Sequence, residues 1–567
     1  MRMRARPYLH CAPVPDGVYF SGARTQFVLR GWDRLFKVAD VCVPLLERGT
    51  TEDELVEALG TERSRSVVRL LTGGLRDHGM LLEGESLLAS APSEADRTRY
   101  AGALAYLESV CADPYAAFAR VRAARVALLG PDDAVQPAVR GLERAGVGEV
   151  HAVDAAEPYA WRGADAVVCC GSAAEPLAEQ LVVRVARDVP EGVAVVPVLL
   201  DEHVLQAGPA VRGDAAQPRL SAVRRRVQAW AQGEGLRPAA RPVADAMAGA
   251  LAGQLALDAL AGVGEEGAAY VVHGDELTAE RIVVAPPAGG TEAGVRALSE
   301  ADREAVPDAD EAIERVHTFT RRFTGLLAPS QAEQDLPQMP LAIREMDFRT
   351  GSAGRVAVWG AHQRDATVGA VLEVLRRSGR LPAGRGKGAA GLTEERWLLD
   401  GALRHLAAEA QPLDAEIVES EETQRIRRTL RDWQAGPLTV RLAEVPGVDW
   451  RLARVEHARS GELLGAAWAS DADTAVREAL STSLAAARIG AARDGATDLP
   501  LLRTDALQLA EAEQVDAVRA QICRLAAARG VSFEGRPLRR DPVLGALPFW
   551  FGPVVVRRLT EEPPHAR

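Results

Sequence analysis

The first 90 residues change from a two-residue to a helical spacing of hydrophobic positions. Short alternating runs at Tyr8–Val14, Val18–Ser21 and Thr25–Arg30 are separated by turn residues, which predicts a three-stranded sheet of hairpins. From Leu35 to Leu46 the apolar residues fall on one helical face, and Gly49 is expected to end that helix.

Two further helices and a last strand complete this segment. Thr51 is placed to cap the second helix, with Glu54 three residues later forming a capping box. Val67–Leu75 has the spacing of a third helix, and Met80–Leu82 returns to a strand. Three strands, three helices and a terminal strand are typical of a winged-helix domain, which we assign to residues 1–90.

The remaining chain predicts a multidomain protein of α/β and α+β class. Residues 91–280 begin with a helical connector, and helical patterns then alternate with four buried strands, which predicts a Rossmann-type parallel sheet. The segment 281–315 is rich in Pro, Gly and acidic residues and is interpreted as a linker. Residues 316–567 have a mixed α+β pattern. The four predicted strands are Val126–Gly130, Val150–Asp154, Ala166–Cys170 and Val193–Leu200.

Composition and charge narrow the function. The 567 residues carry a formal net charge of −12, which argues against a general nucleic-acid binder because phosphates require an excess of Lys and Arg. The six cysteines have no C-x-x-C spacing, so they indicate neither a zinc ribbon nor a disulfide framework. There is no apolar N-terminal segment and no long uninterrupted apolar run, so we expect a cytoplasmic protein without membrane contact.

A nucleotide site is expected to be lost. The loop after the first strand of the α/β segment, Gly130–Ala134, has one glycine, and its carboxylates Asp132 and Asp133 lie where phosphate would bind. Asp154 has the position of a ribose-binding acid, which is a weak signal alone. The run Arg385–Gly388 lacks the spacing of a phosphate loop, and the basic runs Arg224–Arg226 and Arg321–Arg322 are interpreted as solvated helix faces.

The predicted winged helix offers a peptide-binding site. Its third strand is expected to lie at a sheet edge beside the third helix, where an extended peptide can add a strand by backbone hydrogen bonds. Arg65, Arg69 and Arg76 on the helix suit an acidic peptide. Two alternatives are that Phe27 and Leu29 are core residues, and that the domain binds DNA. The predicted contact residues are Thr25, Gln26, Phe27, Val28, Leu29 and Arg30 on the strand and Arg65, Arg69 and Leu70 on the helix.

Two segments resemble known families. Tyr8–Glu83, with Phe36–Asp40 and Leu45–Gly49, resembles the PqqD-type recognition element that binds leader peptides in the modification of ribosomal peptides (RiPPs). Gly208–Gly213 and Pro218–Ala222 resemble a segment of the ThiF-like partner proteins of bacteriocin cyclodehydratases (the Ocin-ThiF group). Arg219 and Ala222 stand at that segment's cysteine positions, so the resemblance implies that the family's structural zinc is absent.

The C-terminal part has a weaker similarity to YcaO proteins. Gly386–Gly388 followed by Leu392–Glu395 resembles their G-K-G segment, which leads into a helix, but the later Glu-Arg pair is replaced by Leu406–Glu409. The resemblances together imply a leader-binding scaffold without zinc or ATP, not an enzyme on its own, that delivers a precursor peptide to a YcaO cyclodehydratase for thiazoline or oxazoline formation, as in thiopeptide biosynthesis.

Other partners and functions stay open. An azoline dehydrogenase and a second copy of the chain are further candidate partners. One alternative is an ATP-dependent peptide-modifying enzyme, adenylating or cyclodehydrating, in its own right. The other is a winged-helix regulator.

Overall fold

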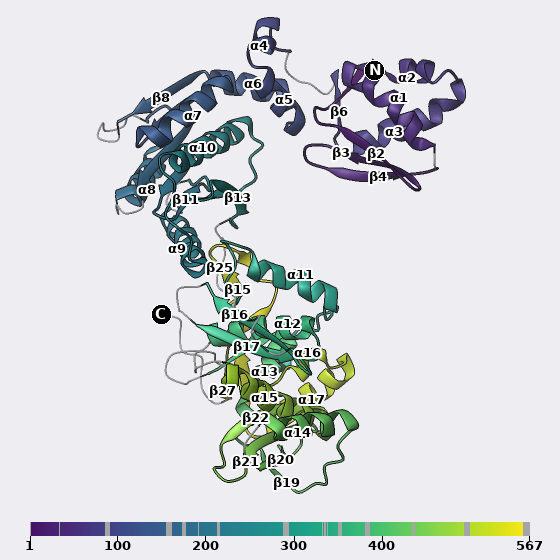
Figure 1. Ribbon diagram of the computed structural model, residues 1–567, viewed down its shortest axis with the longest axis vertical. Coiled ribbons are helices and arrows are strands. Elements are labelled where there is room, and N and C mark those ends of the chain that lie inside the picture. The colour runs from purple at the N-terminus through teal and green to yellow at the C-terminus, as the bar shows by residue number, and fades with distance from the viewer. Residues whose placement is uncertain are drawn as a thin grey trace. The chain divides into compact units, whose positions relative to one another are not determined.

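The fold consists of two units, each with its own sheets and helices. Unit 1 contains Met1–Ser221 and Gly235–Val284, and unit 2 contains Ala222–Glu234 and Ala285–Arg567. Both mix helices and strands, so the predicted α/β and α+β multidomain class is confirmed (Figure 1). The computed structural model describes residues 2–32, 34–84, 91–154, 161–172, 177–190, 192–212, 216–286, 294–330, 333, 336, 338–349, 354–379, 386–433, 437–492 and 499–559.

The N-terminal domain contains the predicted three-stranded sheet, in the order β2-β3-β4. Thr51 caps α2, and the capping box with Glu54 is present. Two strands were not expected, β1 and β5. The strand β1 pairs with β6 and β5, and its Met3 and Ala5 are buried while Arg2 is exposed. The elements are β1 (Arg2–Ala5), β2 (His10–Val14), β3 (Gly17–Ser21), β4 (Gln26–Arg30), α1 (Leu35–Arg48), β5 (Thr50–Thr51), α2 (Glu52–Ala58), α3 (Arg65–Asp77) and β6 (Leu81–Glu83).

The α/β part of unit 1 is built on a seven-stranded sheet in the order β13-β12-β11-β10-β9-β7-β8. Only the four predicted strands are parallel, and the other three add antiparallel strands at one edge, so the prediction of a parallel sheet is correct for that half alone. The elements are α4 (Glu94–Arg99), α5 (Ala101–Val110), α6 (Pro114–Ala123), β7 (Arg125–Leu129), α7 (Asp132–Arg144), β8 (Glu149–Val153), β9 (Ala166–Ser172), α8 (Leu177–Asp188), β10 (Ala194–Leu200), β11 (Val204–Ala207), α9 (Ala216–Glu234), α10 (Val243–Ala261), β12 (Ala268–His273) and β13 (Thr278–Val283).

Helices cover both faces of this sheet. Val126 and Leu128 of β7 pack with α7 and α10, while Ala127 and Leu129 pack with α8 on the other face (Figure 1). By length and a mean hydropathy of 1.3, α10 alone among the described helices passes the test for a membrane span. Half of that window is buried, and α10 contributes to the core of the domain, so we interpret it as a core helix.

Unit 2 contains a four-stranded sheet (β14-β24-β27-β18), a three-stranded sheet (β15-β16-β17) and a five-stranded sheet (β19 to β23). The helix α12 packs on β17 and β18, and α15 packs on β21 and β22. The elements are β14 (Arg296–Ala297), α11 (Ala309–Thr320), β15 (Leu327–Pro329), β16 (Ala342–Phe348), β17 (Arg355–Gly360), α12 (Gln363–Ser378), β18 (Lys387–Gly391), α13 (Glu394–Leu406), β19 (Gln411–Leu413), α14 (Glu421–Trp433), β20 (Leu438–Glu444), β21 (Arg451–His457), β22 (Leu463–Ala469), α15 (Ala472–Ala492), β23 (Leu502–Arg503), α16 (Ala506–Leu509), α17 (Ala512–Ala528), β24 (Val531–Gly535), β25 (Arg540–Asp541), β26 (Gly545–Ala546) and β27 (Trp550–Arg558).

The expected linker, residues 281–315, contains the end of β13, all of β14 and the start of α11; residues 287–293 lie outside the described residues. The part of α9 from Ala222 to Glu234 belongs to unit 2. Arg226 donates to the backbone oxygen of Thr324 at 2.6 Å and pairs with Asp541 at 2.8 Å. Arg226 is buried, so the interpretation of its basic run as a solvated face is wrong for this residue.

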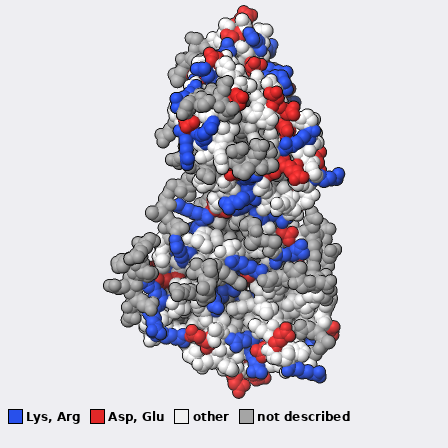
Figure 2. Space-filling view, turned by 90° about the vertical axis from the view of Figure 1, so that its left-hand side faces the viewer, with Lys and Arg blue, Asp and Glu red and all other residues white. Residues whose placement is uncertain are grey.

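Basic and acidic side chains are interspersed on the face drawn in Figure 2, as far as its residues are described. The net charge of −12 is therefore not expressed on this face as one continuous acidic area.

Candidate functional site

The strand β4 and the C-terminal end of α3 lie against each other in the N-terminal domain. Thr25, just before β4, donates its hydroxyl to the backbone oxygen of His78 at 2.8 Å. The ring of Phe27 stacks on the imidazole of His78, with ring centroids 3.9 Å apart. A Cβ added at Gly74 would lie 3.2 Å from Phe27 and 3.4 Å from Leu29. Because Gly74 and His78 are four residues apart, they share the face of α3 that meets β4.

One edge of β4 has no strand partner. Among the described strands, β4 pairs only with β3, so the backbone groups of its other edge are not used in a strand ladder. Phe27 and Leu29 are half-buried, Gln26 and Arg30 are exposed, and Val28 is 42% exposed. Leu70, one turn before Gly74 on α3, is 45% exposed. The structure therefore places Thr25, Phe27 and Leu29 against Gly74 and His78, with Phe27 and Leu29 packed at the margin of the core, and leaves Leu70 exposed on α3.

The predicted arginines of α3 already have acidic neighbours within the domain. Arg65 forms ion pairs with Asp53 at 2.6 Å and with Glu62. Arg69 lies 3.8 Å from Glu52. The side chain of Arg69 is 67% exposed and that of Arg65 is 31% exposed, so Arg69 is the better placed of the two to exchange its partner for an acidic peptide.

The edge of the α/β sheet at Gly130, where the nucleotide site is expected to be lost, is acidic and tightly packed. Gly130 has a positive φ of 128°, and a Cβ there would lie 2.2 Å from the backbone oxygen of Cys170, so the glycine is required by the close approach of β9. The first turn of α7 carries Asp132 and Asp133. Nearby, burial raises the pKa of Asp245; Arg241 opposes this shift and Asp133 adds to it.

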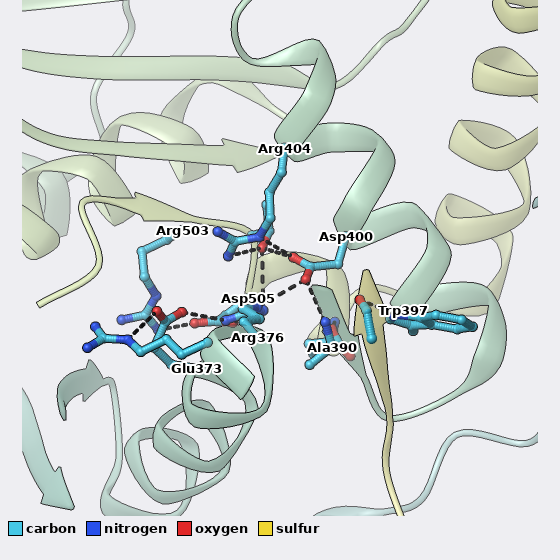
Figure 3. A network of polar contacts seen from close by, with 12 residues as sticks. Glu373, Arg376, Ala390, Trp397, Asp400, Arg404, Arg503 and Asp505 are labelled. Atoms are coloured by element: carbon cyan, nitrogen blue, oxygen red, sulfur yellow. Dashed lines mark hydrogen bonds and ion pairs between the residues drawn. The ribbon is translucent and has the colours of Figure 1, made fainter. Parts of the chain in front are cut away.

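A buried cluster of charges lies in unit 2, where α12 and α13 meet the segment before α16 (Figure 3). Asp400 accepts hydrogen bonds from Arg376 Nε at 3.0 Å, from Arg404 Nε at 3.0 Å and from the backbone N–H of Ala390 at 2.9 Å. The hydroxyl of Thr504 also donates to Asp400. We call Glu373, Arg376, Asp400, Arg404, Arg503, Thr504 and Asp505 the buried charge network.

Opposite charges compensate the burial of this network. Burial alone would raise the pKa of Asp400, but Arg376 and Arg404 hold it below its ordinary value. Burial also acts against ionisation of Asp505, whose pKa Arg503 and Arg376 lower strongly. The network was not predicted from sequence, although Asp400 interrupts the apolar run of α13 and so indicates a buried partner.

The segments that resemble ThiF-like and YcaO proteins are held by contacts within the fold. Arg219 is buried and donates to the backbone oxygen of Val284 at 3.0 Å, while Ala222 is buried on the same helix. Lys387 and Gly388 begin β18, and Thr393 caps α13, so this segment leads into a helix as expected. Arg385 and Gly213 lie outside the described residues. Within the described ranges, no cluster of three or more His, Cys, Asp or Glu side chains could hold a metal ion.

The comparisons with known proteins bear on the whole chain. No family model matches it, and no curated protein matches it in sequence. A solved structure described as a heterocyclase in complex with substrate and cofactor matches with 12% sequence identity and a TM-score of 0.54, covering 98% of this chain and 95% of its own. E. coli MccB, solved with succinimide, has 12% identity and a TM-score of 0.35 over 50% of this chain and 97% of its own.

The heterocyclase likeness corrects one expectation. At 12% identity it shows the fold alone, but that fold extends over 98% of the present chain. The expectation that this chain is not an enzyme on its own assumed that it supplies only part of a catalytic assembly. That expectation is wrong, because the chain has the fold of one whole heterocyclase chain.

Proposed function

We propose that this chain is a peptide-modifying enzyme that binds the leader of a ribosomal precursor peptide and cyclises Cys, Ser or Thr residues of the peptide to thiazoline or oxazoline rings. The observation that carries the proposal is the similarity of nearly the whole chain to a heterocyclase fold. The unpaired edge of β4, with Val28 exposed on it and Leu70 exposed on α3, supports the leader-binding part, because a free strand edge suits an extended peptide.

Leader binding would use the backbone of β4 and the apolar side chains beside it. The peptide adds a strand to β4, and one of its apolar side chains packs against Leu29 and Leu70. Full burial of one such side chain contributes about 1.5–3 kcal/mol. That energy corresponds to roughly 10- to 150-fold in affinity, at about 1.4 kcal/mol for each factor of ten.

The YcaO resemblance implies that the reaction uses ATP, but neither the edge of the sheet at Gly130 nor the buried charge network of unit 2 fits a triphosphate. At Gly130 the nearby side chains of α7 and α10 are carboxylates. In unit 2 the carboxylates of Asp400 and Asp505 are already paired with arginines, which leaves them unsuited to a phosphate or to its metal ion. We therefore assign no step of the reaction to a bound nucleotide, and ATP enters only as a variable of the test.

The test of the proposed function is intact-mass spectrometry of the precursor peptide encoded beside this chain's gene, after incubation with the full chain, Mg²⁺ and ATP. Each ring formed lowers the peptide mass by one water. Mass loss with this chain alone supports the proposal. Loss that appears only after a separate YcaO cyclodehydratase is added refutes it.

The leader-binding surface has its own test, fluorescence anisotropy of the labelled leader with two matched variants. Gly74→Leu pushes a side chain against Phe27 and Leu29 and should weaken binding by about tenfold or more. Gly73→Leu, the control, adds the same side chain to the same helix where nothing lies within 4 Å of an added Cβ. Equal affinity of both variants would place the leader elsewhere.

A further inference from the structure

Unit 2 contains a cavity of about 240 Å³ at the beginning of α12. One face of the helix, including Arg364, Val368 and Leu372, forms one wall. Glu478 of α15 and the segment from Arg503 to Leu509 contribute to the others. The cavity does not take part in the proposed leader binding.

Arg503 is the side chain that indicates a ligand. It is 4% exposed, lies with its guanidinium 4.9 Å from the centroid of the Trp359 ring, and donates Nη2 to the backbone oxygen of Trp359 at 3.1 Å. It also forms an ion pair with Asp505. Its Nε and Nη1 have no hydrogen-bond partner within the part of the chain that the structure describes. Leaving buried donors of a charged group unsatisfied is costly, so these two N–H groups favour an acceptor from outside the protein.

The cavity wall carries charges of both signs, since three arginines line it together with the carboxylates of Asp308, Asp365, Glu478 and Asp505. The backbone at the start of α12 favours an anion, while the side chain of Asp365 stands in the same first turn. The α12 helix has 16 residues, and its first turn lies in the cavity wall. Backbone N–H groups at the start of a helix lack partners within the helix and attract negative charge. Arg364 and Arg477 also line the cavity, and their present partners, Asp310 and Glu422, form ion pairs with them that are at least partly exposed to solvent.

We propose that this cavity binds the anionic group of a small ligand, a carboxylate or a phosphate-type oxyanion, through Arg503 and the first turn of α12. The apolar wall formed by Val368, Leu372 and Leu392 would take the uncharged part of the same ligand. The shared chemistry is an oxyanion on a partly apolar small molecule.

Protonation of Glu478 should control the affinity of this site. Burial raises the pKa of Glu478 to about 7, against the opposing effect of Arg503 and Arg477 and with a further increase from Asp505 and Asp365. When Glu478 is ionised, it repels an incoming anion and competes for Arg503. Affinity should therefore rise as the pH falls from about 8 to about 6, through the range in which Glu478 takes up a proton.

The test is isothermal titration of the full chain with sulfate and, separately, with acetate at constant ionic strength. Both probes remain ionised from about pH 6 to about pH 8, so a change in affinity reports on the protein. Saturable binding of either probe, weakened about tenfold or more by Arg503→Gln, is the expected result. Sulfate preference indicates a phosphate-type ligand, and acetate preference a carboxylate. Binding of neither probe overturns the proposal.

Two further variants keep the test decisive. Arg519→Gln, the control, removes an arginine that pairs with Glu395 at 3.1 Å in the same unit but outside the cavity; equal weakening by this variant overturns the proposal. Glu478→Gln should bind the anion with the same affinity at both pH values. If Arg503→Gln does not fold, the comparison of the wild type with Glu478→Gln decides. A wild-type affinity that is the same at about pH 6 and about pH 8 refutes the site.

Discussion

Replacing Asp400 with Asn should destabilise unit 2 severely. The Asp400 carboxylate is fully buried and accepts hydrogen bonds from Arg376, Arg404, Thr504 and the backbone of Ala390. Asn has nearly the same shape but no charge, and its amide group can serve only part of this set of donors. The substitution leaves the Arg376 guanidinium, 2% exposed, with less compensating negative charge.

The expected loss in the free energy of unfolding follows from the number and kind of hydrogen bonds that Asp400 accepts. A hydrogen bond to a charged group contributes about 1.5–3 kcal/mol, and Asp400 accepts two from guanidinium groups. Such contributions overlap within one network, and breaking a buried ion pair from one side costs about 3–5 kcal/mol in total. We therefore expect the free energy of unfolding of unit 2 to fall by about 3–5 kcal/mol.

The assay is urea unfolding followed by tryptophan fluorescence, since most of the nine tryptophans lie in unit 2. The matched control is Asp310→Asn, the same chemical change at a surface pair with Arg364, 2.9 Å apart, in which both side chains are mostly exposed. Such a pair is worth about 1 kcal/mol or less. An equally small loss for Asp400→Asn would refute the reasoning that this network stabilises unit 2.

The remaining predictions concern pH, peptide binding, thiol reactivity and packing. Asp400 and Asp505 have folded pKa values below their unfolded value of about 4, so the stability they contribute is present above that pH and lost as the pH falls through the folded values; acid titration of unfolding checks this. Leu29→Asp should weaken leader binding, measured by anisotropy, by about tenfold or more while the circular dichroism is unchanged, because it places a charge at the apolar leader-binding surface. Burial raises the pKa of Cys169 and Cys170, so a thiol reagent at about pH 8 should label both only after unfolding. Gly249→Ala should lower the melting temperature, since its Cβ would lie 1.9 Å from the backbone oxygen of Ala134, whereas Gly141→Ala, with nothing within 4 Å, should not.

Local signals in the sequence predict the N-terminal domain well. The Thr51 capping box and the end of α1 before Gly49 depend on neighbouring residues, and both are present. The edge position of β4 follows from the order of strands and helices. The strand β1 was missed although Arg2 and Arg4 alternate with Met3 and Ala5, because four residues at a chain start are too few to distinguish a strand from an irregular end.

Features that depend on distant residues were not predicted. Strand direction is not encoded in the period of hydrophobic residues, so the antiparallel half of the seven-stranded sheet was missed. The buried charge network joins Arg376, Asp400 and Asp505, which are separated by up to 129 residues. Burial of Arg226 likewise depends on Asp541, 315 residues away, so a run of arginines alone could not distinguish a solvated from a buried face.

The measurement that tests the central claim most directly compares two peptides by intact mass after incubation with this chain alone, Mg²⁺ and ATP: the full precursor and its core without the leader. We predict loss of one water per ring from the full precursor, little or none from the leaderless core, and a much slower loss from the full precursor with the Gly74→Leu variant. An unchanged mass of the full precursor, with the leader bound and ATP present, would contradict the assignment of this chain as a leader-guided heterocyclising enzyme.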